Sequence, residues 1–445
     1  MCARKSIKPR MIALEQAKAY ISAAPYQKIS IKDNLRSMTT GALACLVPTG
    51  NTELTHKTGI YLGENAYTKS PIFYDMFIGP PTITNPHLYV AGASGAGKSV
   101  LLKLISARSA ASGEWVVILD PEKEYQSLIK YLGGQYIDLR PGKKSGINPM
   151  DLEIEFDDND KKYVNIDAKI SDVREMLNTF CEKFRPGEPL NGKELSNIEE
   201  VIKELYFEKG ITSDPDTLYE DVEEEKDGKY YINKVKKTMP TLKDLREKLE
   251  KIDATQSLAE TMKIITDDKS MAMFDCQTTI DLNNKIIGIN FKDISSEFDK
   301  FYAMINVLTW IWSKFSNYKF KPIKKKVIVD EGWYFARSQK SADFLEGIAR
   351  RGRKYRISLC IATQQISEFL NSVSGKSVID QCATKILMKQ EPIVAREIAE
   401  CLVMSKRCHE LMSTFSAGQA ILSAESELVV LNVKPFDFEW QYVTT

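Results

Sequence analysis

Short, almost continuous apolar runs recur along this chain and alternate with longer segments whose apolar residues are spaced as on a helix. Such runs are typical of strands buried on both faces of a parallel sheet. They lie at 88–91, 115–119, 135–139, 286–291, 326–329, 357–362, 384–388, 420–423 and 428–433. Helices are expected between them, for example at 298–315 and 342–354. The pattern therefore predicts an α/β fold with a mostly parallel sheet and helices on both of its faces.

The pattern changes between residues 151 and 271, where charged residues dominate and apolar residues recur at helical spacing. Thr241, followed three residues later by Asp244, is typical of a helix N-terminus. The acidic run at 220–225 is expected to be a solvated loop. This region therefore predicts a helical subdomain that is inserted into the α/β core.

The first 77 residues have a mixed pattern. A helix is expected at 11–22, an apolar segment lies at 38–47, and strands are expected at 59–63 and 71–74, separated by a turn at 64–65. This stretch is not self-sufficient, and we expect it to be the tail of an N-terminal domain together with the strands that lead into the core. The predicted parts are therefore 1–77, a core formed by 78–150 and 272–445, and an insertion at 151–271.

Composition narrows the class of protein. The chain has 445 residues, enough for two or three domains, and is 43% hydrophobic and 27% charged, as in ordinary soluble proteins. No apolar run is long enough to span a bilayer. The net charge of +1 gives no global attraction to nucleic acid, so contact with DNA needs a local basic face. Eight scattered cysteines without a CxxC pair indicate reduced thiols in a cytoplasmic protein.

A phosphate-binding pattern, G-x-x-x-x-G-K-[ST], follows the apolar run at 88–91. In this pattern the glycines let backbone N–H groups surround a phosphate, the lysine reaches the outer phosphates, and the last hydroxyl binds Mg²⁺. A helix is expected to begin near the lysine and to point its positive end at the same phosphates. The predicted nucleotide site consists of Gly92, Ala93, Ser94, Gly95, Ala96, Gly97, Lys98 and Ser99.

Two later strands end in residues that complete such a site. The run at 326–329 is followed by Asp330 and Glu331. An aspartate in this position typically serves Mg²⁺ through water, and the adjacent glutamate can deprotonate the attacking water. The run at 357–362 leads to Gln364, whose amide can sense the γ-phosphate or hold that water. Two acids at a sheet edge and a polar helix cap are the plainer interpretations, but the full phosphate loop favours catalytic roles for Lys98, Glu331 and Gln364, with Ser99 and Asp330 at the metal.

A basic segment at 350–356 lies between these two strands. In a ring ATPase, an arginine from one subunit can stabilise the charge that develops on the neighbour's γ-phosphate, and Arg351 and Arg353 are candidates for this role. The same arginines can line a pore or bind DNA phosphates. They can also form a solvated helix end that the helix dipole favours. The residues alone leave these interpretations open.

With these motifs, the chain resembles the TraC-like, VirB4-class ATPases of conjugative transfer and type IV secretion, in the FtsK/HerA P-loop superfamily. The resemblance covers nearly the whole chain. Besides the loop, it rests on the segments 59–63, 71–75, 85–88, 120–125, 147–151, 329–333, 353–355 and 362–364. At Gly332 the family often has alanine.

The resemblance implies a RecA-like fold with a helical insertion, Mg²⁺-dependent ATP hydrolysis, and assembly into a ring, expected to be a hexamer, at the cytoplasmic face of a membrane channel. The family's motif residues match Lys98, Ser99, Asp330, Glu331 and Gln364. Expected partners are other copies of the chain and components of the secretion channel, with DNA as a further candidate. Full-length members carry a large N-terminal domain that docks on the apparatus. Only its tail is expected here, which leaves membrane docking open.

The leading hypothesis is an energy-coupling ATPase that drives substrate translocation or pilus assembly. The first alternative is a DNA-translocating motor or coupling protein that acts directly on nucleic acid, although the lack of a membrane-spanning run counts against a typical coupling protein. The second alternative is a regulatory or scaffold protein that binds ATP without turnover. The intact Lys98, Asp330 and Glu331 speak against that second alternative.

Overall fold

The computed structural model describes residues 14–24, 29–31, 40, 54–156, 161–226, 229–267, 271–280, 284–336, 339–364, 366, 369 and 373–444. The chain divides into two compact units, Met1–Thr52 and Glu53–Thr445. In the first unit, α1 (Gln16–Ala23) occupies part of the helix expected at 11–22. Apart from Thr40, the apolar segment at 38–47 lies outside the described residues. The other elements belong to the second unit.

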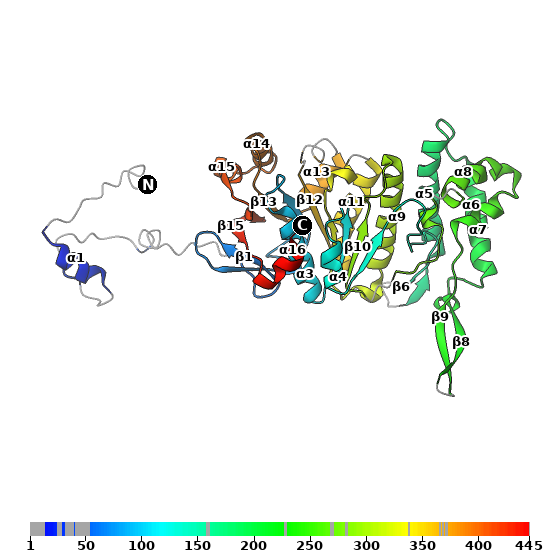
Figure 1. Ribbon diagram of the computed structural model, residues 1–445, viewed down its shortest axis with the longest axis horizontal. Coiled ribbons are helices and arrows are strands. Elements are labelled where there is room, and N and C mark those ends of the chain that lie inside the picture. Colours follow the sequence, from blue (N-terminus) through cyan, green and yellow to red (C-terminus); the bar gives the residue numbers. More distant parts are fainter. Residues whose placement is uncertain are drawn as a thin grey trace. The chain divides into compact units, whose positions relative to one another are not determined.

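The described part of the second unit is built on an eleven-stranded sheet with the order β2-β1-β15-β14-β13-β3-β12-β11-β4-β10-β5 (Figure 1). Neighbouring strands from β5 to β13 are parallel, and those from β13 to β2 are antiparallel. The mostly parallel α/β fold is therefore confirmed, with an antiparallel extension on one side. The strands are β1 (Ile60–Asn65), β2 (Pro71–Tyr74), β3 (Leu88–Ala91), β4 (Trp115–Asp120), β5 (Gln135–Asp138), β10 (Ile286–Asn290), β11 (Lys325–Val329), β12 (Ile357–Thr363), β13 (Thr384–Met388), β14 (Gln419–Ala424) and β15 (Glu427–Val433).

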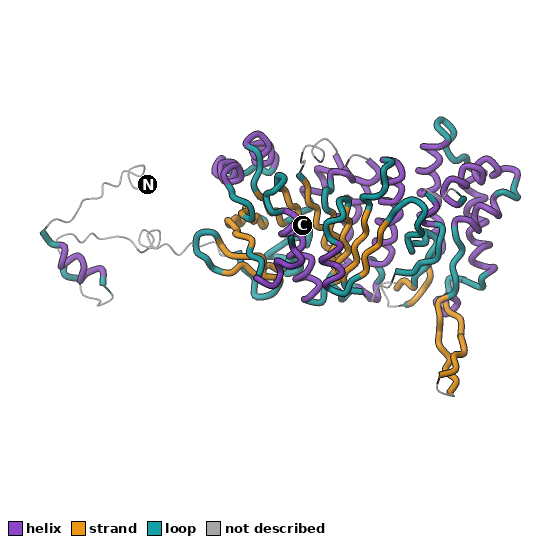
Figure 2. The backbone as a smooth tube through the Cα atoms, viewed as in Figure 1, coloured by secondary structure: helices purple, strands orange, loops and turns teal. Residues whose placement is uncertain are grey.

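Alternate residues of the central strands enter two hydrophobic cores, one on each face of the sheet. In β3, Leu88 and Val90 lie in one core, and Tyr89 and Ala91 lie in the other. This burial on both faces is why the apolar runs are continuous rather than alternating. Figure 2 shows the strands flanked by helices. The first core is covered by α3 (Lys98–Ala111), α4 (Gln126–Tyr131) and α16 (Trp440–Val443), and the second by α9 (Glu297–Phe315), α11 (Gln339–Arg351), α13 (Val373–Asp380), α14 (Pro392–Cys401) and α15 (Lys406–Thr414).

The two early strands belong to the main sheet. β1 pairs with β15, with Gly63 opposite Val433, so this compact unit begins at Glu53 rather than at the predicted boundary after residue 77. The turn expected at 64–65 is wrong, because β1 continues through Asn65. The Asn65 side chain accepts hydrogen bonds from the amides of Tyr67 (2.9 Å) and Thr68 (3.2 Å). The turn therefore lies at residues 66–68, directly after β1.

The insertion contains the expected helices. They are α5 (Ile166–Phe184), α6 (Gly192–Glu208), α7 (Leu242–Leu249) and α8 (Gln256–Thr266). The predicted start of α7 is confirmed, because Thr241 and Asp244 form a reciprocal capping box. Apolar residues of these helices continue the core on the α9 side of the sheet. Among the described residues, no helix combines the length and the apolar character needed to cross a lipid bilayer.

The insertion also contains two hairpins that helical spacing did not predict. One pairs β6 (Ile154–Phe156) with β7 (Lys162–Val164), and the other pairs β8 (Tyr219–Lys226) with β9 (Lys229–Lys236), which projects from the helices (Figure 1). The expectation of a loop at 220–225 is therefore wrong. In the ladder, Asp221 lies opposite Lys234, so opposite charges face each other across the strands. The Asp-Gly dipeptide at 227–228 of the sequence is the hairpin signal that the acidic composition obscured.

Candidate functional site

The phosphate loop connects β3 to α3 and is held by residues at the carboxyl ends of β12 and β13, the two neighbours of β3 in the sheet. The amide of Gly92 donates to the Thr363 oxygen (3.3 Å), and the amide of Ala93 donates to the Lys389 oxygen (2.9 Å). Gly97 is the N-cap of α3, with φ of +96°, and a Cβ there would approach the Gly418 nitrogen at 3.2 Å. Glycine suits this position because it adopts positive φ without steric cost. The loop is therefore a defined cradle at the N-terminus of a fourteen-residue helix, the local arrangement that binds phosphate.

Lys98 connects this cradle to the predicted acidic pair. It lies in the first turn of α3 and is buried. Its Nζ donates to Oδ1 of Asp330 at 3.1 Å and also to Oε1 of Glu331. Both acids follow β11, which is separated from β3 in the sheet by a single strand, β12. Ser99 is the next residue of the helix and is half-buried beside the loop.

Glu331 is held by donors from two further segments. Gln364, just after β12, donates through Nε2 to Oε1 of Glu331 at 2.6 Å. The indole nitrogen of Trp333 donates to Oε2 at 2.9 Å. The backbone of Glu331 has φ of +47°, an uncommon conformation for a residue with a side chain and one that clusters at functional sites. The structure thus brings Lys98, Asp330, Glu331 and Gln364 together, and their catalytic roles stay a prediction.

A third acid, Asp120, organises the segment that follows β4. It ends β4, and its carboxylate accepts hydrogen bonds from the amides of Glu124 and Tyr125 (3.0 Å each) and from the Tyr136 hydroxyl (2.7 Å). The Tyr125 hydroxyl in turn donates to Oδ2 of Asp330 at 2.8 Å. Sequence reasoning used the 120–125 segment for the family resemblance and assigned it no role. The sequence signal for a role of Asp120 was its position directly after the apolar run at 115–119.

The two predicted arginines lie far from the phosphate loop of their own chain. Arg351 ends α11, and its guanidinium lies 4.7 Å from the Trp312 ring centroid. Arg353 is exposed in the turn that precedes β12. The seven residues of β12 span roughly 20 Å and separate this turn from Gln364 at the opposite edge of the sheet. An action of Arg351 or Arg353 on a nucleotide therefore requires the nucleotide of a neighbouring copy.

The site residues fit a nucleotide with Mg²⁺. Lys98 forms ion pairs with both Asp330 and Glu331, so two carboxylates share a single ammonium at the phosphate loop. Among the described residues, no group of three or more His, Cys, Asp or Glu side chains is arranged to hold a metal by protein ligands alone. Mg²⁺ usually takes one or two protein carboxylates together with substrate phosphates and water, and Asp330 and Glu331 offer such carboxylates beside the phosphate-loop lysine.

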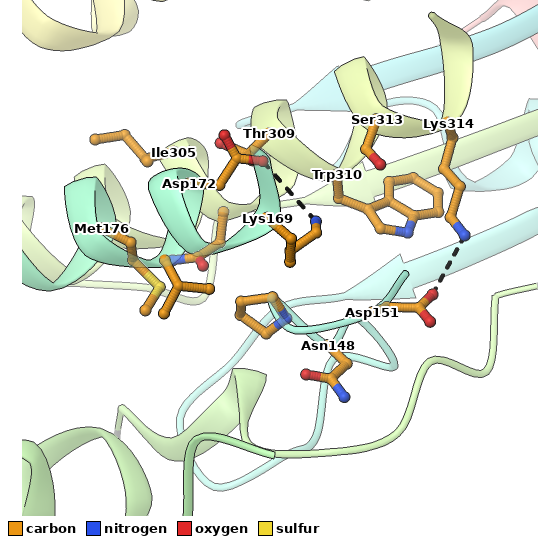
Figure 3. A pocket seen from close by; sticks show the side chains of 13 residues that line it. Asn148, Asp151, Lys169, Asp172, Met176, Ile305, Thr309, Trp310, Ser313 and Lys314 are labelled. Carbon is orange, nitrogen blue, oxygen red and sulfur yellow. Dashed lines mark hydrogen bonds and ion pairs between the residues drawn. The ribbon is translucent and has the colours of Figure 1, made fainter. Parts of the chain in front are cut away.

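A separate cavity lies between α5 of the insertion and α9 of the core (Figure 3). It encloses about 20 Å³, enough for a water molecule or two and far too small for a nucleotide. Lys314 of α9 reaches Asp151 at 3.2 Å across it. Burial raises the pKa of Asp151, but Lys314 together with Lys236 outweighs this effect and lowers that pKa to about 2. The charged side chains that line the cavity form ion pairs with one another. The cavity is therefore part of the contact between the insertion and the core.

A glycine loop between a central strand and its helix, with an acidic pair at the end of a nearby parallel strand, defines a P-loop NTPase core of the RecA-like α/β class. The chain belongs to the family of TraG P-loop domains, whose family model matches residues 59–421.

Known relatives agree with this assignment. The chain is 21% identical to protein TraC of Escherichia coli K12 over 347 residues, which cover 75% of this chain and 35% of TraC. It is 20% identical to the type IV secretion system protein VirB4 of Bartonella quintana over 358 residues, covering 80% of this chain and 39% of that protein. The chain thus spans between a third and two fifths of the length of these curated relatives. The predicted resemblance to TraC-like, VirB4-class ATPases is confirmed.

A solved structure supports the fold. The structure of VirB4 of Thermoanaerobacter pseudethanolicus superposes with a TM-score of 0.68 at 22% identity and covers 88% of this chain and 100% of that chain. At this identity the match concerns the fold. It confirms the RecA-like α/β architecture predicted from the apolar runs.

Proposed function

We propose that this chain hydrolyses ATP with Mg²⁺ as a subunit of a ring, expected to be a hexamer, and that the ring powers conjugative transfer or type IV secretion by substrate translocation or pilus assembly. The observation that supports this most directly is the contact of the phosphate-loop Lys98 with Asp330 and Glu331, which Gln364 joins through Glu331. A buried glutamate next to the loop, beyond the aspartate that would serve the metal, is in a position to accept a proton from the attacking water.

Each residue of the cluster has a role in this proposal. The loop amides and Lys98 bind the phosphates, and Ser99 with Asp330 would hold Mg²⁺. When bound, the metal would neutralise charge on the phosphate that is transferred. Glu331 accepts the proton of the attacking water, and Gln364 orients that water or senses the γ-phosphate.

The proposed ring accounts for the distant arginines. Arg351 and Arg353 lie at the edge of the sheet opposite their own phosphate loop, so one of them acts on the γ-phosphate bound to a neighbouring copy. The names of the relatives suggest where the ring works, because one of them is a type IV secretion system protein. We place this chain in the cytoplasm, peripheral to the inner face of the cell membrane, with channel components as partners.

The first test measures ATP turnover and assembly together. The 445-residue chain is incubated with ATP and Mg²⁺ over a range of protein concentrations, and its mass is measured with and without ATP. We expect slow hydrolysis by the monomer, faster hydrolysis as rings form, and no turnover in Lys98→Ala. Absence of Mg²⁺-dependent turnover at every concentration would contradict the hydrolase, and full activity in a demonstrated monomer would contradict the ring.

A DNA-translocating motor or coupling protein is the second candidate, and one surface favours it. Arg353 and Arg356 line a pocket of about 230 Å³ together with Phe77. Arginines beside an aromatic ring are a combination that binds single-stranded nucleic acid. ATP turnover is therefore measured with and without single-stranded DNA across salt concentrations. Strong, salt-sensitive stimulation would identify DNA as the direct substrate, and its absence would favour a motor that acts on other components.

A further inference from the structure

The Asp330 carboxylate is bound differently at its two oxygens. Oδ1 accepts hydrogen bonds from Lys98 Nζ (3.1 Å) and from the Glu331 amide (2.9 Å), so it faces the phosphate loop. Oδ2 accepts from the hydroxyl of Tyr125 at 2.8 Å. Tyr125 is completely buried, so water does not compete for this bond. The phenol therefore holds the side of the carboxylate that faces away from the loop.

Tyr125 is itself fixed from several directions. Its amide donates to Oδ2 of Asp120 at 3.0 Å, and Asp120 ends β4, the strand next to β11. The Tyr136 hydroxyl holds the same Asp120 oxygen at 2.7 Å, and Lys103 Nζ lies 5.8 Å from the centroid of the Tyr125 ring. The position of the phenol is therefore fixed through Asp120, at the end of a central strand of the sheet.

We propose that Tyr125 is a positioning residue for Asp330, and that its hydroxyl fixes the rotation of the carboxylate so that Oδ1 faces the phosphate loop. The torsion that rotates a carboxylate is broad, and Mg²⁺ tolerates little departure from ideal ligand geometry. Outer partners that orient a metal ligand commonly change metal affinity by about 10- to 100-fold. This proposal rests on the proposed function, in which Asp330 serves Mg²⁺.

The test compares Tyr125→Phe with a matched control, Tyr74→Phe. Tyr74 is also buried and shares a hydrogen bond of 2.7 Å with Thr384, far from the loop. Binding of a fluorescent ATP analogue is measured with EDTA and then across a Mg²⁺ titration. For Tyr125→Phe we expect metal-free affinity within about twofold of wild type, and a Mg²⁺ concentration at half effect that is raised about tenfold. Tyr74→Phe should change neither value.

A double-mutant cycle with Asp330→Asn separates positioning from general loss of structure. If Tyr125 acts through Asp330, adding Tyr125→Phe to Asp330→Asn has no further effect on the Mg²⁺ titration. An unchanged Mg²⁺ titration in Tyr125→Phe would overturn the proposal, as would an equal shift in Tyr74→Phe.

The binding measurement needs no hydrolysis, so the two proposals fail separately. If wild type binds the analogue with Mg²⁺ but does not turn over ATP, the proposed hydrolase is wrong and the titration still decides on Tyr125. If Mg²⁺ has no effect on wild-type binding, Asp330 has no metal to position and this inference is overturned as well.

Discussion

Gln364 donates a hydrogen bond of 2.6 Å to Oε1 of Glu331, the same oxygen that accepts from Lys98. The other carboxylate oxygen, Oε2, accepts from the Trp333 indole at 2.9 Å. Two donors saturate Oε1, whereas Oε2 keeps one acceptor position. A polyphosphate that draws Lys98 to itself would release a position on Oε1 for water. Phosphate binding and access of water to Oε1 of Glu331 are therefore coupled through this lysine.

Glu331→Gln should bind nucleotide and lose turnover. The amide preserves the size of the side chain but cannot take a proton from water, so we expect turnover to fall by about 100- to 10,000-fold. Nucleotide binding, measured by fluorescence, and steady-state ATP hydrolysis check this together. Glu260→Gln on α8, an exposed acid of the insertion, is the control and should retain full activity. Undiminished hydrolysis in Glu331→Gln would remove Glu331 from the role of base.

Gly332→Ala should destabilise the turn that carries Glu331, although the family often has alanine here. A Cβ on Gly332 would lie 2.5 Å from Cγ2 of Ile361 and 3.1 Å from the tip of Phe369. Overpacking of this kind costs about 1–3 kcal/mol. Thermal unfolding measures the loss, and ATP turnover should fall with it because Glu331 shifts.

The matched control for this substitution is Gly192→Ala, in the first turn of α6. No neighbouring atom lies within 4 Å of a Cβ built at Gly192. It should leave the unfolding midpoint unchanged or raise it slightly, because alanine is the better helix former. If the two variants unfold alike, crowding at Gly332 is not the cause.

The parts of the site that the sequence predicted are those encoded in one local segment. The run ending at Ala91 is followed directly by the glycine loop, and the run ending at Val329 is followed directly by Asp330. In a parallel sheet the carboxyl ends of the strands lie at the same edge. Residues that directly follow two such strands are therefore expected to lie close together, whatever their separation in the chain.

The parts that were missed depend on the order of strands in space. Tyr125 reaches Asp330 because β11 lies between β4 and β12, and 205 residues separate the two in the chain. Likewise, β1 joins the sheet only through β15, near the other end of the chain. Apolar runs predict that strands exist, but carry little information on which strands become neighbours. The acidic strand β8 was not predicted for another reason. A hairpin that is solvated on both faces has no buried face, so its sequence shows no alternation of apolar and polar residues.

Lys325→Met should flatten the pH dependence of stability. Lys325 is buried at the start of β11, and burial, followed by the nearby Arg356 charge, lowers its pKa to about 7. The unfolded lysine titrates near 10.4, so between these values the unfolded chain binds more protons. The free energy of unfolding of wild type therefore rises with pH over this window, by up to about 1.4 kcal/mol per pH unit. The variant should lack this rise and be the more stable protein near pH 7.

Lys326→Met, at the next position, is the contrasting control. Lys326 is buried in an ion pair with Glu114, so its loss strands a buried carboxylate and should cost about 3–5 kcal/mol. Urea unfolding from pH about 7 to about 9 measures both variants. Parallel pH profiles for wild type and Lys325→Met would show that Lys325 is charged throughout this window.

Arg108→Lys should weaken the junction of α3 with the C-terminal segment, although the charge is kept. Nε of Arg108 donates to Oε1 of Glu439 at 2.9 Å, and the guanidinium also binds the other Glu439 oxygen and the backbone oxygens of Tyr61 and Lys434. It lies 5.1 Å from the ring centroids of both Tyr61 and Phe436. A lysine ammonium cannot reproduce the planar fork or the stacking.

Loss of one or two hydrogen bonds to the buried Glu439 carboxylate should lower the free energy of unfolding by about 2 kcal/mol. The control is Arg407→Lys, where an exposed arginine lies 3.3 Å from Glu410, and we expect a change below about 0.5 kcal/mol. Urea unfolding of both variants provides the comparison. Because Arg108 lies at the C-terminal end of α3 and the phosphate loop at its N-terminal end, nucleotide binding below the unfolding transition should stay at the wild-type level. Equal stability of the two variants would mean that charge alone, without the fork geometry, holds this junction.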